Sequence, residues 1–341
     1  MKEDKPTSFD IAYRAGVSQS TVSRALRNSP LVSEQTREKV QLIAKELNYK
    51  VDINARNLRS QHSKTIALLL CEDPSSGESM INPFFLSMLG SITRATARHG
   101  YDLLISFQQS SEDWQADYED SHRADGIIFL GYGDYLTYIE RISQLAEDGA
   151  HFITWGPVMA DQPGYFIGCD NRDGAYLVTR HLLALGRKRI AFLGGASEHC
   201  PEFNERYQGY EKALKEVGIA LDPLLQLDAE TSEEAGYQAV QQLDKRNIDY
   251  DAIFGASDLI AIGAIKALKE QGIKVPQGVA VVGFDDIPIA SYMNPPLTTV
   301  QQDTKLAGEL LVEYLLELVG GGVIESRLLP AKLMVRGSCG V

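Results

Sequence analysis

Cysteine is scarce in this sequence and does not occur in a metal-binding or redox pattern. The 341 residues contain four cysteines, widely separated at Cys71, Cys169, Cys200 and Cys339, with no C-x-x-C motif and no His/Cys cluster at zinc spacing. This absence argues against a zinc finger or a dithiol redox centre, and we expect no metal site. Isolated cysteines of this kind are typical of a protein in a reducing compartment.

Long apolar segments are missing as well. The longest apolar run, Ile66–Cys71, is far shorter than the roughly 20 residues that a helix needs to cross a bilayer. The chain starts with MKEDKP, which lacks the apolar stretch of a signal peptide. We therefore expect a cytoplasmic protein with no membrane partner.

The sequence also lacks the common catalytic motifs. It has no P-loop, no G-x-S-x-G elbow and no His-based triad, and Gly131–Leu136 lacks the third small residue of a dinucleotide-binding loop. Asp285 and Asp286 are adjacent carboxylates, so an enzyme such as a sugar kinase or a dehydrogenase stays as an alternative. In the context of the features below, we expect a binding protein and not an enzyme.

Charge is distributed unevenly along the chain. The net charge of −13 argues by itself against a nucleic-acid partner. Residues 1–64, however, hold 12 Lys and Arg against 7 Asp and Glu, whereas the remainder holds 21 against 39. A basic head on an acidic body suits a DNA-binding protein in which only the head contacts phosphate, although such a skew also arises by chance.

Residues 7–47 predict three helices. Thr7 and Asp10 have nearly the spacing of a capping box, and Gly16 ends this first helix. Ser18 caps a second helix over 19–26, and Ser33 caps a third from about Glu34 to Leu47. Apolar residues at helical spacing are Ile11, Ala12, Ala15, Val22, Ala25, Leu26, Val40, Ile43, Ala44 and Leu47. Two short helices joined by a Gly-containing turn form the helix-turn-helix pattern.

The second helix has a polar face suited to DNA. It carries Gln19, Ser20, Thr21, Ser23 and Arg24, and it has no carboxylate for phosphate to repel. Gln and Arg can form paired hydrogen bonds with base edges, and Ser and Thr hydroxyls can donate to phosphates. An ordinary solvated helix face is the alternative interpretation.

Residues 51–60 join this head to the rest of the chain. Ala55, Leu58 and Arg59 suit a helix that is too short to be stable alone. A plain flexible linker is the alternative.

From residue 64 onward, apolar runs alternate with helical patterns. The candidate strands are Ile66–Cys71, Asp102–Ser106, Gly126–Leu130, Phe152–Thr154, Arg189–Leu193, Ala252–Gly255 and Val279–Phe284. The candidate helices cover 84–99, 136–149, 173–185, 204–217, 232–243, 258–271 and 303–319. This alternation predicts an α/β core of parallel sheets flanked by helices. The strand–helix units are too many for one compact sheet, so we expect two α/β lobes. Ligands of such folds bind at the carboxyl ends of the strands, here in the cleft between two lobes.

Aromatic and polar residues gather at these predicted strand ends and helix starts. The candidates for ligand binding are Asn82, Phe84, Phe85, Trp155, Asp170, Arg206, Asp258 and Asp285. Aromatic faces and charged groups that bond pairs of hydroxyls are what a neutral polyol needs for binding in water. Structural alternatives are that Phe84 and Phe85 belong to the core, that Asp258 caps a helix and that Asp170 lies in a turn.

The head resembles the LacI/GalR family of transcription regulators. The matching stretches are Ile11–Leu26, then Val32-Ser33 with Thr36, Arg37, Lys39 and Val40, and finally Leu47–Tyr49. The resemblance implies that Gln19, Ser20 and Arg24 face bases in the major groove. It places Ser18, Thr21, Ser23, Ser33 and Tyr49 near the phosphate backbone. It also implies a hinge helix that orders on DNA and puts Ala55 and Leu58 in the minor groove. Val51 and Asn54 depart from the usual Pro and apolar residue of that hinge.

The rest of the chain resembles the same family and the related periplasmic sugar-binding proteins. The matching stretches are Asn82–Phe85, Ala124–Ile128, Cys169–Ala175, Leu185–Gly195, Arg206–Tyr210, Ser257–Gly263, Val281–Asp286 and Pro296–Val300. The resemblance implies that Phe84, Asp170, Arg206 and Asp285 contact the effector. The departures are Trp155 where the family often has Asp, Thr231 in place of an aromatic platform, and Cys200 and Glu202 at variable pocket positions.

The resemblance also implies the domain boundaries. The helix-turn-helix domain covers 1–50, the hinge helix and linker cover 51–63, and the sugar-binding and dimerisation core covers 64–341. Within that core, we expect one lobe at about 64–166 and 297–326 and the other at 167–296 and 327–341, with crossovers near 166, 297 and 326. The chain ends soon after Arg336 without a leucine-heptad tail, so we expect a homodimer and not a tetramer.

Together these features predict a repressor of carbohydrate-utilisation genes. Its partners would be roughly palindromic double-stranded operator DNA and a sugar or sugar derivative, which controls operator affinity from the cleft between the lobes. We expect no other cofactor. A plain sugar-binding module, such as a transport receptor, is a further alternative, against which the basic head argues.

Overall fold

Two compact units, Met1–Ser63 and Lys64–Val341, make up the computed structural model, and we call them the head and the core. The structure describes residues 6–49, 62–71, 81–107, 114–131 and 134–340. No helix in these ranges is long and apolar enough to cross a membrane. Each unit is described by itself below.

Three helices form the head: α1 (Ser8–Ala15), α2 (Gln19–Leu26) and α3 (Glu34–Glu46). Ser18 and Ser33 cap α2 and α3 as predicted, because their hydroxyls accept hydrogen bonds from the backbone N–H groups of Thr21 and Thr36, at 3.1 and 3.3 Å. Gly16 takes a left-handed backbone conformation, with φ of 67°, and ends α1. The buried faces meet in a small core of Ile11, Ala12, Ala15, Val22, Ala25, Val32, Val40 and Ala44. The predicted helix-turn-helix is confirmed.

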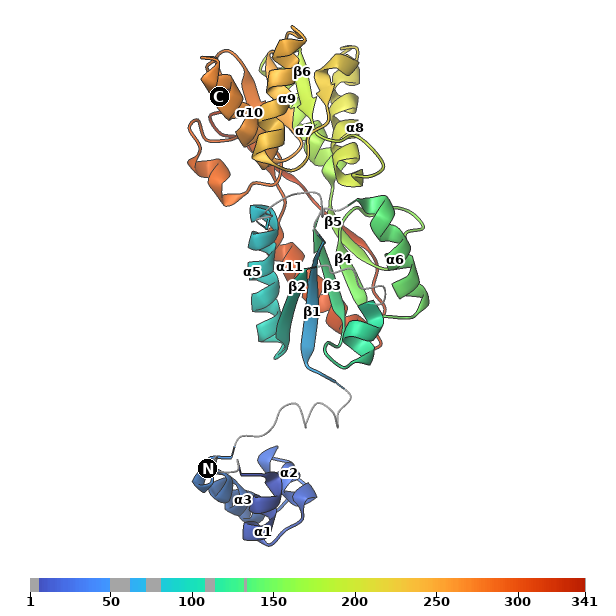
Figure 1. The fold of residues 1–341 in the computed structure, drawn as a ribbon, viewed down its shortest axis with the longest axis vertical. Helices are drawn as coiled ribbons and strands as arrows, with labels where there is room; N and C mark the ends of the chain where they lie inside the picture. The colour runs from blue at the N-terminus through green and yellow to red at the C-terminus, as the bar shows by residue number, and fades with distance from the viewer. Residues whose placement is uncertain (1–5, 50–61, 72–80, 108–113, 132–133, 341) are drawn as a thin grey trace. The chain divides into compact units, whose positions relative to one another are not determined.

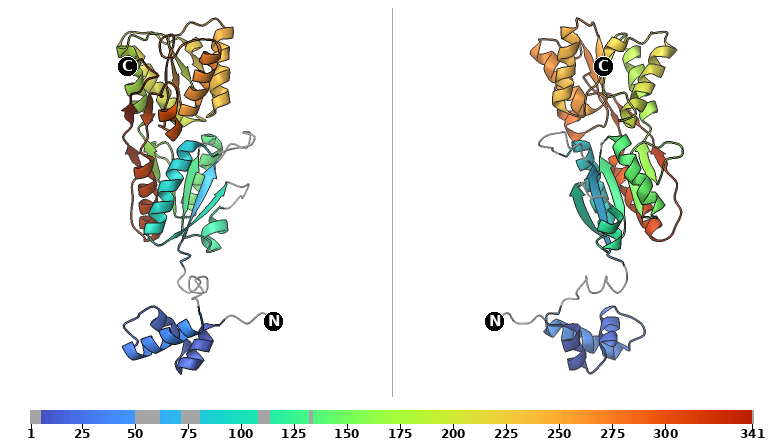
Figure 2. Two further views of the ribbon diagram at one scale, coloured as in Figure 1. Left: turned by 90° about the vertical axis from the view of Figure 1, so that its left-hand side faces the viewer. Right: turned by 45° about the vertical axis from the view of Figure 1, so that its right-hand side comes forward.

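A six-stranded parallel sheet is the centre of the first lobe of the core. In spatial order its strands are β11 (Arg327–Leu329), β5 (Phe166–Cys169), β4 (Phe152–Trp155), β3 (Ile127–Gly131), β1 (Thr65–Cys71) and β2 (Asp102–Phe107). Helices α5 (Pro83–Arg98) and α11 (Thr304–Val319) cover one face, and α6 (Tyr135–Glu147) covers the other (Figures 1 and 2). A sheet covered on both faces buries its central strands completely, which explains the continuous apolar run in β1.

A four-stranded parallel sheet is the centre of the second lobe. Its spatial order is β7 (Gln226–Leu227), β6 (Ile190–Leu193), β8 (Ala252–Gly255) and β9 (Ala280–Val282). Helices α7 (Asn171–Ala184) and α8 (Pro201–Glu216) pack together, as do α9 (Glu233–Lys245) and α10 (Asp258–Glu270), one pair on each side of the sheet (Figure 2). Two short 3-10 helices, η2 (Pro223–Leu225) and η3 (Pro288–Tyr292), lie in the connections, and a π-helical turn, η1 (Ala116–Asp120), precedes β3 in the first lobe. The predicted α/β fold with two parallel sheets is confirmed.

The chain passes between the two lobes three times. It leaves the first lobe after β5, returns through β10 (Thr299–Gln301) to α11, and leaves again from β11 to β12 (Lys332–Met334), which pairs antiparallel with β10. We expected two of these crossovers near 166 and 326. Backbone pairing between β5 and β11 instead keeps the chain in the first sheet as far as Cys169 and Leu329.

The strands that the sequence did not predict are β5, β7, β10, β11 and β12. Each is four residues or shorter, which is too few to show a periodic pattern. The predicted strand Val279–Phe284 is shorter in the structure, because Gly283 and Asp285 donate their backbone N–H groups to Thr298 and Val300 instead of to a strand of the second sheet.

Candidate functional site

The polar face of α2 is available on the head. Ser20 and Arg24 are exposed, and Gln19, Thr21 and Ser23 are half-buried. The Gln19 amide donates a hydrogen bond of 2.9 Å to the Ser8 hydroxyl on α1, which fixes its position relative to the neighbouring helix. These are the residues predicted to contact bases and phosphates, and the structure gathers them on one short helix.

Hydroxyl groups cluster at the N-terminus of α2. The Ser18 Oγ lies 2.7 Å from the Ser20 Oγ and 2.9 Å from the Thr21 Oγ1. Partial positive charge at a helix N-terminus favours an anion, so this arrangement suits a phosphate group. Ser33 occupies the corresponding position on α3, and Tyr49 packs against the head core. Ala55 and Leu58, the predicted minor-groove residues, lie outside the described residues, as do Val51 and Asn54.

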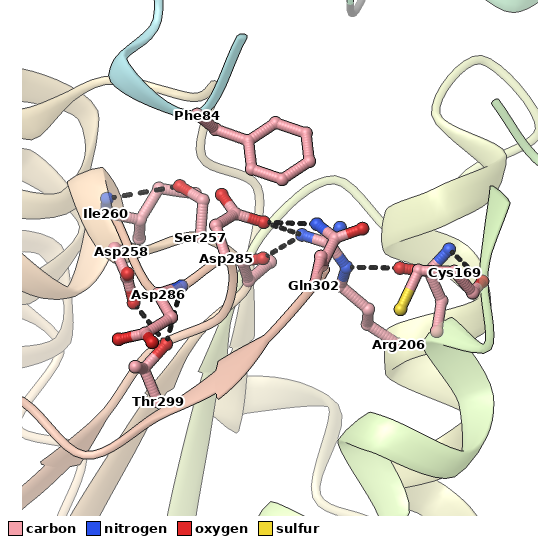
Figure 3. Close-up of polar contacts among 12 residues, drawn as sticks. Phe84, Cys169, Arg206, Ser257, Asp258, Ile260, Asp285, Asp286, Thr299 and Gln302 are labelled. Atoms are coloured by element: carbon pink, nitrogen blue, oxygen red, sulfur yellow. Dashed lines mark hydrogen bonds and ion pairs between the residues drawn. The ribbon is translucent and has the colours of Figure 1, made fainter. Parts of the chain in front are cut away.

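A buried ion pair is the central feature of the core. The Arg206 guanidinium on α8 lies 3.5 Å from the Asp285 carboxylate, and both side chains are buried. Arg206 also donates to the Asn171 side-chain oxygen at 2.8 Å, and Gln302 donates to Asp285 at 2.7 Å (Figure 3). The guanidinium carbon sits 3.9 Å above the Phe284 ring. Because Gln302 leads into α11, this network joins the second lobe to a segment that returns to the first.

The turn after β9 has a strained backbone. Asp285 and Asp286 have φ values of 115° and 54°, which residues other than glycine rarely adopt. Arg336 donates a hydrogen bond of 2.6 Å to the Asp286 carboxylate, and Gln301 donates to its other oxygen at 2.9 Å. Strain of this kind persists where surrounding bonds hold it in place, and it clusters at functional sites.

Three predicted ligand-binding residues bond the backbone of their own lobe. Asn82 and Asp170 cap α5 and α7, accepting hydrogen bonds from backbone N–H groups at 2.9 Å in both cases. Asp258 follows the capping residue of α10, and its carboxylate accepts from the Ile287 backbone at 2.8 Å and the Thr299 hydroxyl at 2.5 Å. Asp258 is fully buried and ties α10 to β10. Ser257 caps α10, so the structural alternative of Asp258 as a helix cap is not what the structure shows, and its predicted contact with an effector stays a prediction.

Aromatic side chains from the first lobe approach the Arg206–Asp285 pair. Phe84 and Phe85, at the start of α5, are buried with ring centroids 5.2 Å apart. The Phe84 centroid lies 6.0 Å from that of Trp155 at the end of β4. In Figure 3 the Phe84 ring extends toward Asp285 and Gln302. The Phe84–Trp155 pair joins the start of α5 to the carboxyl end of β4.

A cavity of about 50 Å³ lies between the lobes. Its walls from the first lobe are Cys71, Gly131, Tyr135, Tyr138, Thr154, Trp155, Gly156, Pro157 and Phe166, and those from the second lobe are Cys200, Glu202, Phe203 and Thr231. Beside it, the His199 ring lies 3.0 Å from the Asp134 carboxylate, and the His199 carbonyl accepts from the Tyr135 N–H at 3.0 Å. The cavity is thus bordered by direct contacts between the lobes, at the carboxyl ends of β1, β3 and β4.

Burial changes the acidity of several groups in the core, two of which, Glu202 and Tyr138, line this cavity. It raises the pKa of Glu202 and, together with the charge of Asp285, raises that of Asp258 well above the usual value. Burial also raises the pKa of Asp285 to about 6, while Arg206 and Gln302 act in the opposite direction. The phenol of Tyr138 has a raised pKa from burial and stays protonated as a hydrogen-bond donor.

Comparison with known families and proteins identifies the chain. Residues 9–52 match the model of bacterial regulatory proteins, lacI family, and residues 179–339 match the periplasmic binding protein-like domain. The transcriptional repressor CytR of Escherichia coli is 32% identical over 342 residues, covering 99% of this chain and 97% of CytR. The chain belongs to the lacI family. The family's regulator MalR of Clostridium butyricum is 33% identical, covering 97% of this chain and 98% of MalR.

Solved structures of lacI-family regulators share the whole fold. The lac repressor dimer bound to operator and the anti-inducer ONPF superimposes with a TM-score of 0.84 at 29% identity, covering 98% of this chain and 99% of that one. The complex of the regulator CelR with cellobiose gives a TM-score of 0.71 at 30% identity, covering 98% and 99%. This chain is therefore a DNA-binding transcription regulator of the lacI family.

In this lacI-family regulator, one predicted ligand residue lines the cavity. Trp155 does so, together with Cys200, Glu202 and Thr231, which we singled out as departures from the family pattern. The remaining candidates are absent from its wall: Asn82, Phe84, Phe85, Asp170, Arg206, Asp258 and Asp285. Their contact with an effector stays a prediction.

Sequence analysis missed the tyrosines of α6. Tyr135 and Tyr138 line the cavity, yet we considered Gly131–Leu136 only as a possible dinucleotide loop. The available signal was its position, since this segment follows a predicted central strand, where ligands of parallel sheets bind. No group of three or more His, Cys, Asp or Glu side chains suited to a metal ion occurs in the ranges that the structure describes.

Proposed function

We propose that this regulator is a repressor whose affinity for operator DNA is controlled by a small sugar bound between the core lobes. The observation that carries the proposal is the cavity whose walls come from both lobes. A ligand there contacts both lobes at once, so it stabilises one arrangement of the lobes over another. Control of DNA binding then follows from the different affinity of the ligand for the two arrangements.

A sugar suits the walls of this cavity. Trp155, Phe203 and Tyr135 offer aromatic surface for C–H groups, while Glu202 and Thr154 offer polar groups for hydroxyls. The similar structures include CelR with cellobiose and a regulator from Enterococcus faecium with bound ribose, which covers 80% of this chain at 24% identity with a TM-score of 0.68. We infer that the protein binds its effector and does not transform it. A closer lobe arrangement would bring Phe84, Arg206 and Asp285 toward that effector as well.

The head would bind the operator through α2. Gln19, Ser20 and Arg24 would contact bases in the major groove, and the hydroxyl cluster of Ser18 and Thr21 would bind phosphate, with Ser23, Ser33 and Tyr49 nearby. Ala55 and Leu58 would enter the minor groove at the centre of the operator. A regulator of this kind works where the chromosome lies, so we place it in the cytoplasm.

The protein would act as a homodimer. Leu86 on α5 and Ile105 and Phe107 on the edge strand β2 are 47%, 45% and 46% exposed. Contiguous exposed apolar residues on neighbouring elements are typical of an interaction surface. The lac repressor in the similar operator complex is a dimer, and two heads on one dimer explain a roughly palindromic site.

The test uses the full-length protein and a palindromic site selected from random DNA. A thermal-shift screen against mono- and disaccharides identifies a ligand, since a ligand at about 100 times its Kd adds roughly 2.7 kcal/mol to the folded state. Fluorescence anisotropy then measures operator affinity with and without that sugar. We expect a change of at least about tenfold, which corresponds to roughly 1.4 kcal/mol of coupling.

A matched pair of variants separates the two activities. Arg24→Ala should weaken operator binding and leave sugar binding intact, whereas Arg180→Ala, an exposed core residue, should change neither. A sugar that binds tightly but leaves operator affinity unchanged would contradict the proposed control.

A further inference from the structure

Gln19 on the head is held by a residue of the neighbouring helix. It is the first residue of α2, and its side-chain amide donates a hydrogen bond of 2.9 Å to the hydroxyl of Ser8, the first residue of α1. Both residues are half-buried. A glutamine whose side chain is already fixed loses less conformational freedom when it binds a partner. The bond therefore prepares Gln19 for contact with DNA.

The Ser8 hydroxyl is available for this bond because Thr7 occupies the capping position of α1. The Thr7 backbone N–H and the Thr7 hydroxyl both donate to the Asp10 carboxylate, at 2.7 Å in each case. The Ser8 hydroxyl takes no part in this cap and instead bonds Gln19, eleven positions along the chain. Removing the Ser8 hydroxyl would thus loosen Gln19 and leave the cap of α1 in place.

The bond to Ser8 leaves the rest of the Gln19 amide available. It uses one of the two hydrogens on Nε2, and within residues 6–49 the other hydrogen and Oε1 have no partner. The amide can therefore present one donor beside one acceptor.

Among the four bases, adenine has the edge that matches this pair of groups. In the major groove its N7 accepts a hydrogen bond and its N6 amino group donates one, side by side. Guanine presents two acceptors there, whereas cytosine and thymine each present a single hydrogen-bonding group. Only adenine can form two hydrogen bonds with one glutamine amide in this way.

We infer that Gln19 contacts an adenine in each half-site of the operator, and that Ser8 is the positioning residue that sharpens this choice. The inference deepens the proposed function and rests on it, because it names a base that the head recognises. Arg24, whose guanidinium has donors only, suits guanine instead. The two residues would thus specify different positions of the half-site.

The test starts from an operator that the full-length protein selects from random DNA. Each base pair of one half-site is replaced in turn by the other three, and fluorescence anisotropy gives the Kd of every duplex. Gln19→Ala should lose discrimination at one position. In the unsubstituted protein, adenine at that position should bind about tenfold more tightly than any other base.

Substitutions at Ser8 then test its positioning role. Ser8→Ala should lower the adenine preference to about threefold and leave the affinity for an unrelated duplex unchanged, which also shows that the head is folded. Ser8→Thr keeps a hydroxyl and should restore the preference. In a Gln19→Ala background, Ser8→Ala should have no further effect on discrimination, because Ser8 acts through Gln19. Ser29→Ala removes a hydroxyl that bonds the turn after α2 and should not alter the adenine preference.

The outcomes separate this inference from the proposed function. A preference for another base at the Gln19 position, or full discrimination by Gln19→Ala at every position, would overturn the adenine contact. Full discrimination by Ser8→Ala would overturn the role of Ser8. Each of these results leaves a sugar-controlled repressor standing, whereas a selection that yields no preferred sequence would overturn both.

Discussion

Arg206 shows how one side chain can hold several segments of the core in place. Its guanidinium contacts the carboxylate after β9, the first residue of α7 and the carbonyl before α10, with aromatic rings on two sides. A buried cation is tolerated when each of its donors has a partner. Removing the cation would therefore leave these acceptor groups buried without their hydrogen-bond donor.

Arg206→Ala should lower the free energy of unfolding by about 3–5 kcal/mol, because it leaves the Asp285 carboxylate and the Asn171 oxygen buried without their donor. Urea denaturation of the full-length protein measures this change. Arg180→Ala removes an exposed pair with Glu216 and should cost less than about 1 kcal/mol. Equal losses in the two variants would show that burial of the Arg206 pair has no special importance.

Asp285 should make stability depend on pH. Its pKa is raised by burial from 3.8 to about 6 in the folded state, so the folded chain keeps this proton to higher pH than the unfolded chain does. The stabilisation from the protonated form is fully present below pH 3.8 and is lost as pH rises through about 6. The pKa difference corresponds to about 3 kcal/mol at most.

Asp285→Asn removes this titration and should flatten the fall in unfolding free energy between about pH 4 and pH 6. It also removes a charge that raises the pKa of Asp258, which acts in the same direction. Denaturation curves collected across this pH range give the slope for each protein. If the unfolding free energies of the variant and the unsubstituted chain fall equally steeply with pH, Asp285 is not the titrating group, even if one protein is more stable than the other at every pH.

At the scale of elements, glycine sets how closely the helices pack. Gly236 on α9 and Gly263 on α10 face each other's helix, and a Cβ on either one would overlap a backbone carbonyl oxygen, of Ile260 and Glu233 respectively. Backbone atoms cannot move aside as a flexible side chain does. The spacing of this helix pair therefore depends on the absence of two side chains.

Gly236→Ala should destabilise the protein by about 1–3 kcal/mol, because the added methyl group forces α9 away from α10. Intrinsic helix propensity favours alanine over glycine by about 1 kcal/mol and acts in the opposite direction. Gln238→Ala, on the exposed face of the same helix, should stay within about 0.5 kcal/mol. Thermal denaturation distinguishes the two, and a stabilised Gly236→Ala variant would contradict the close packing.

At the scale of the whole molecule, charge is distributed unevenly along the chain, and the first lobe exposes apolar side chains on two neighbouring elements. Basic residues are concentrated in the first 64 residues, so an acidic protein can still approach DNA through one part. Apolar surface is exposed on α5 and β2 of the first lobe. Dimerisation through that surface would give the protein two heads for one operator.

Phe107→Asp should weaken the proposed dimer, since burying a carboxylate without a partner in an apolar interface is unfavourable. Sedimentation velocity should show a shift toward the monomer, and operator affinity should fall with it. Tyr292→Asp, at a residue 86% exposed on the second lobe, tests whether the interface extends there. An unchanged dimer with Phe107→Asp would exclude the β2 edge as the interface.

Local chemistry allowed much of the architecture to be predicted from sequence. The three head helices follow from the capping by Ser18 and Ser33 and the left-handed turn at Gly16, all of which depend on neighbouring residues. The longer strands and the helices of the core follow from apolar runs and helical spacing. Cys200, Glu202 and Thr231 stood out because they depart from a family pattern, and that comparison also needs only the sequence.

Tertiary structure decided which groups the candidate site residues contact. Asp258 and Asp285 were both candidates for ligand binding, yet one bonds backbone and hydroxyl groups while the other pairs with Arg206. Short strands such as β5 and β11 form because segments far apart in the sequence pair with each other. A run of two to four residues is too short to show the alternation that predicts a strand. Tyr135 and Glu202 are 67 positions apart, and they line one cavity only because both chain segments end at the facing edges of two sheets. Sequence fixes local conformation through neighbouring atoms, whereas a binding site between lobes depends on the packing of the entire core.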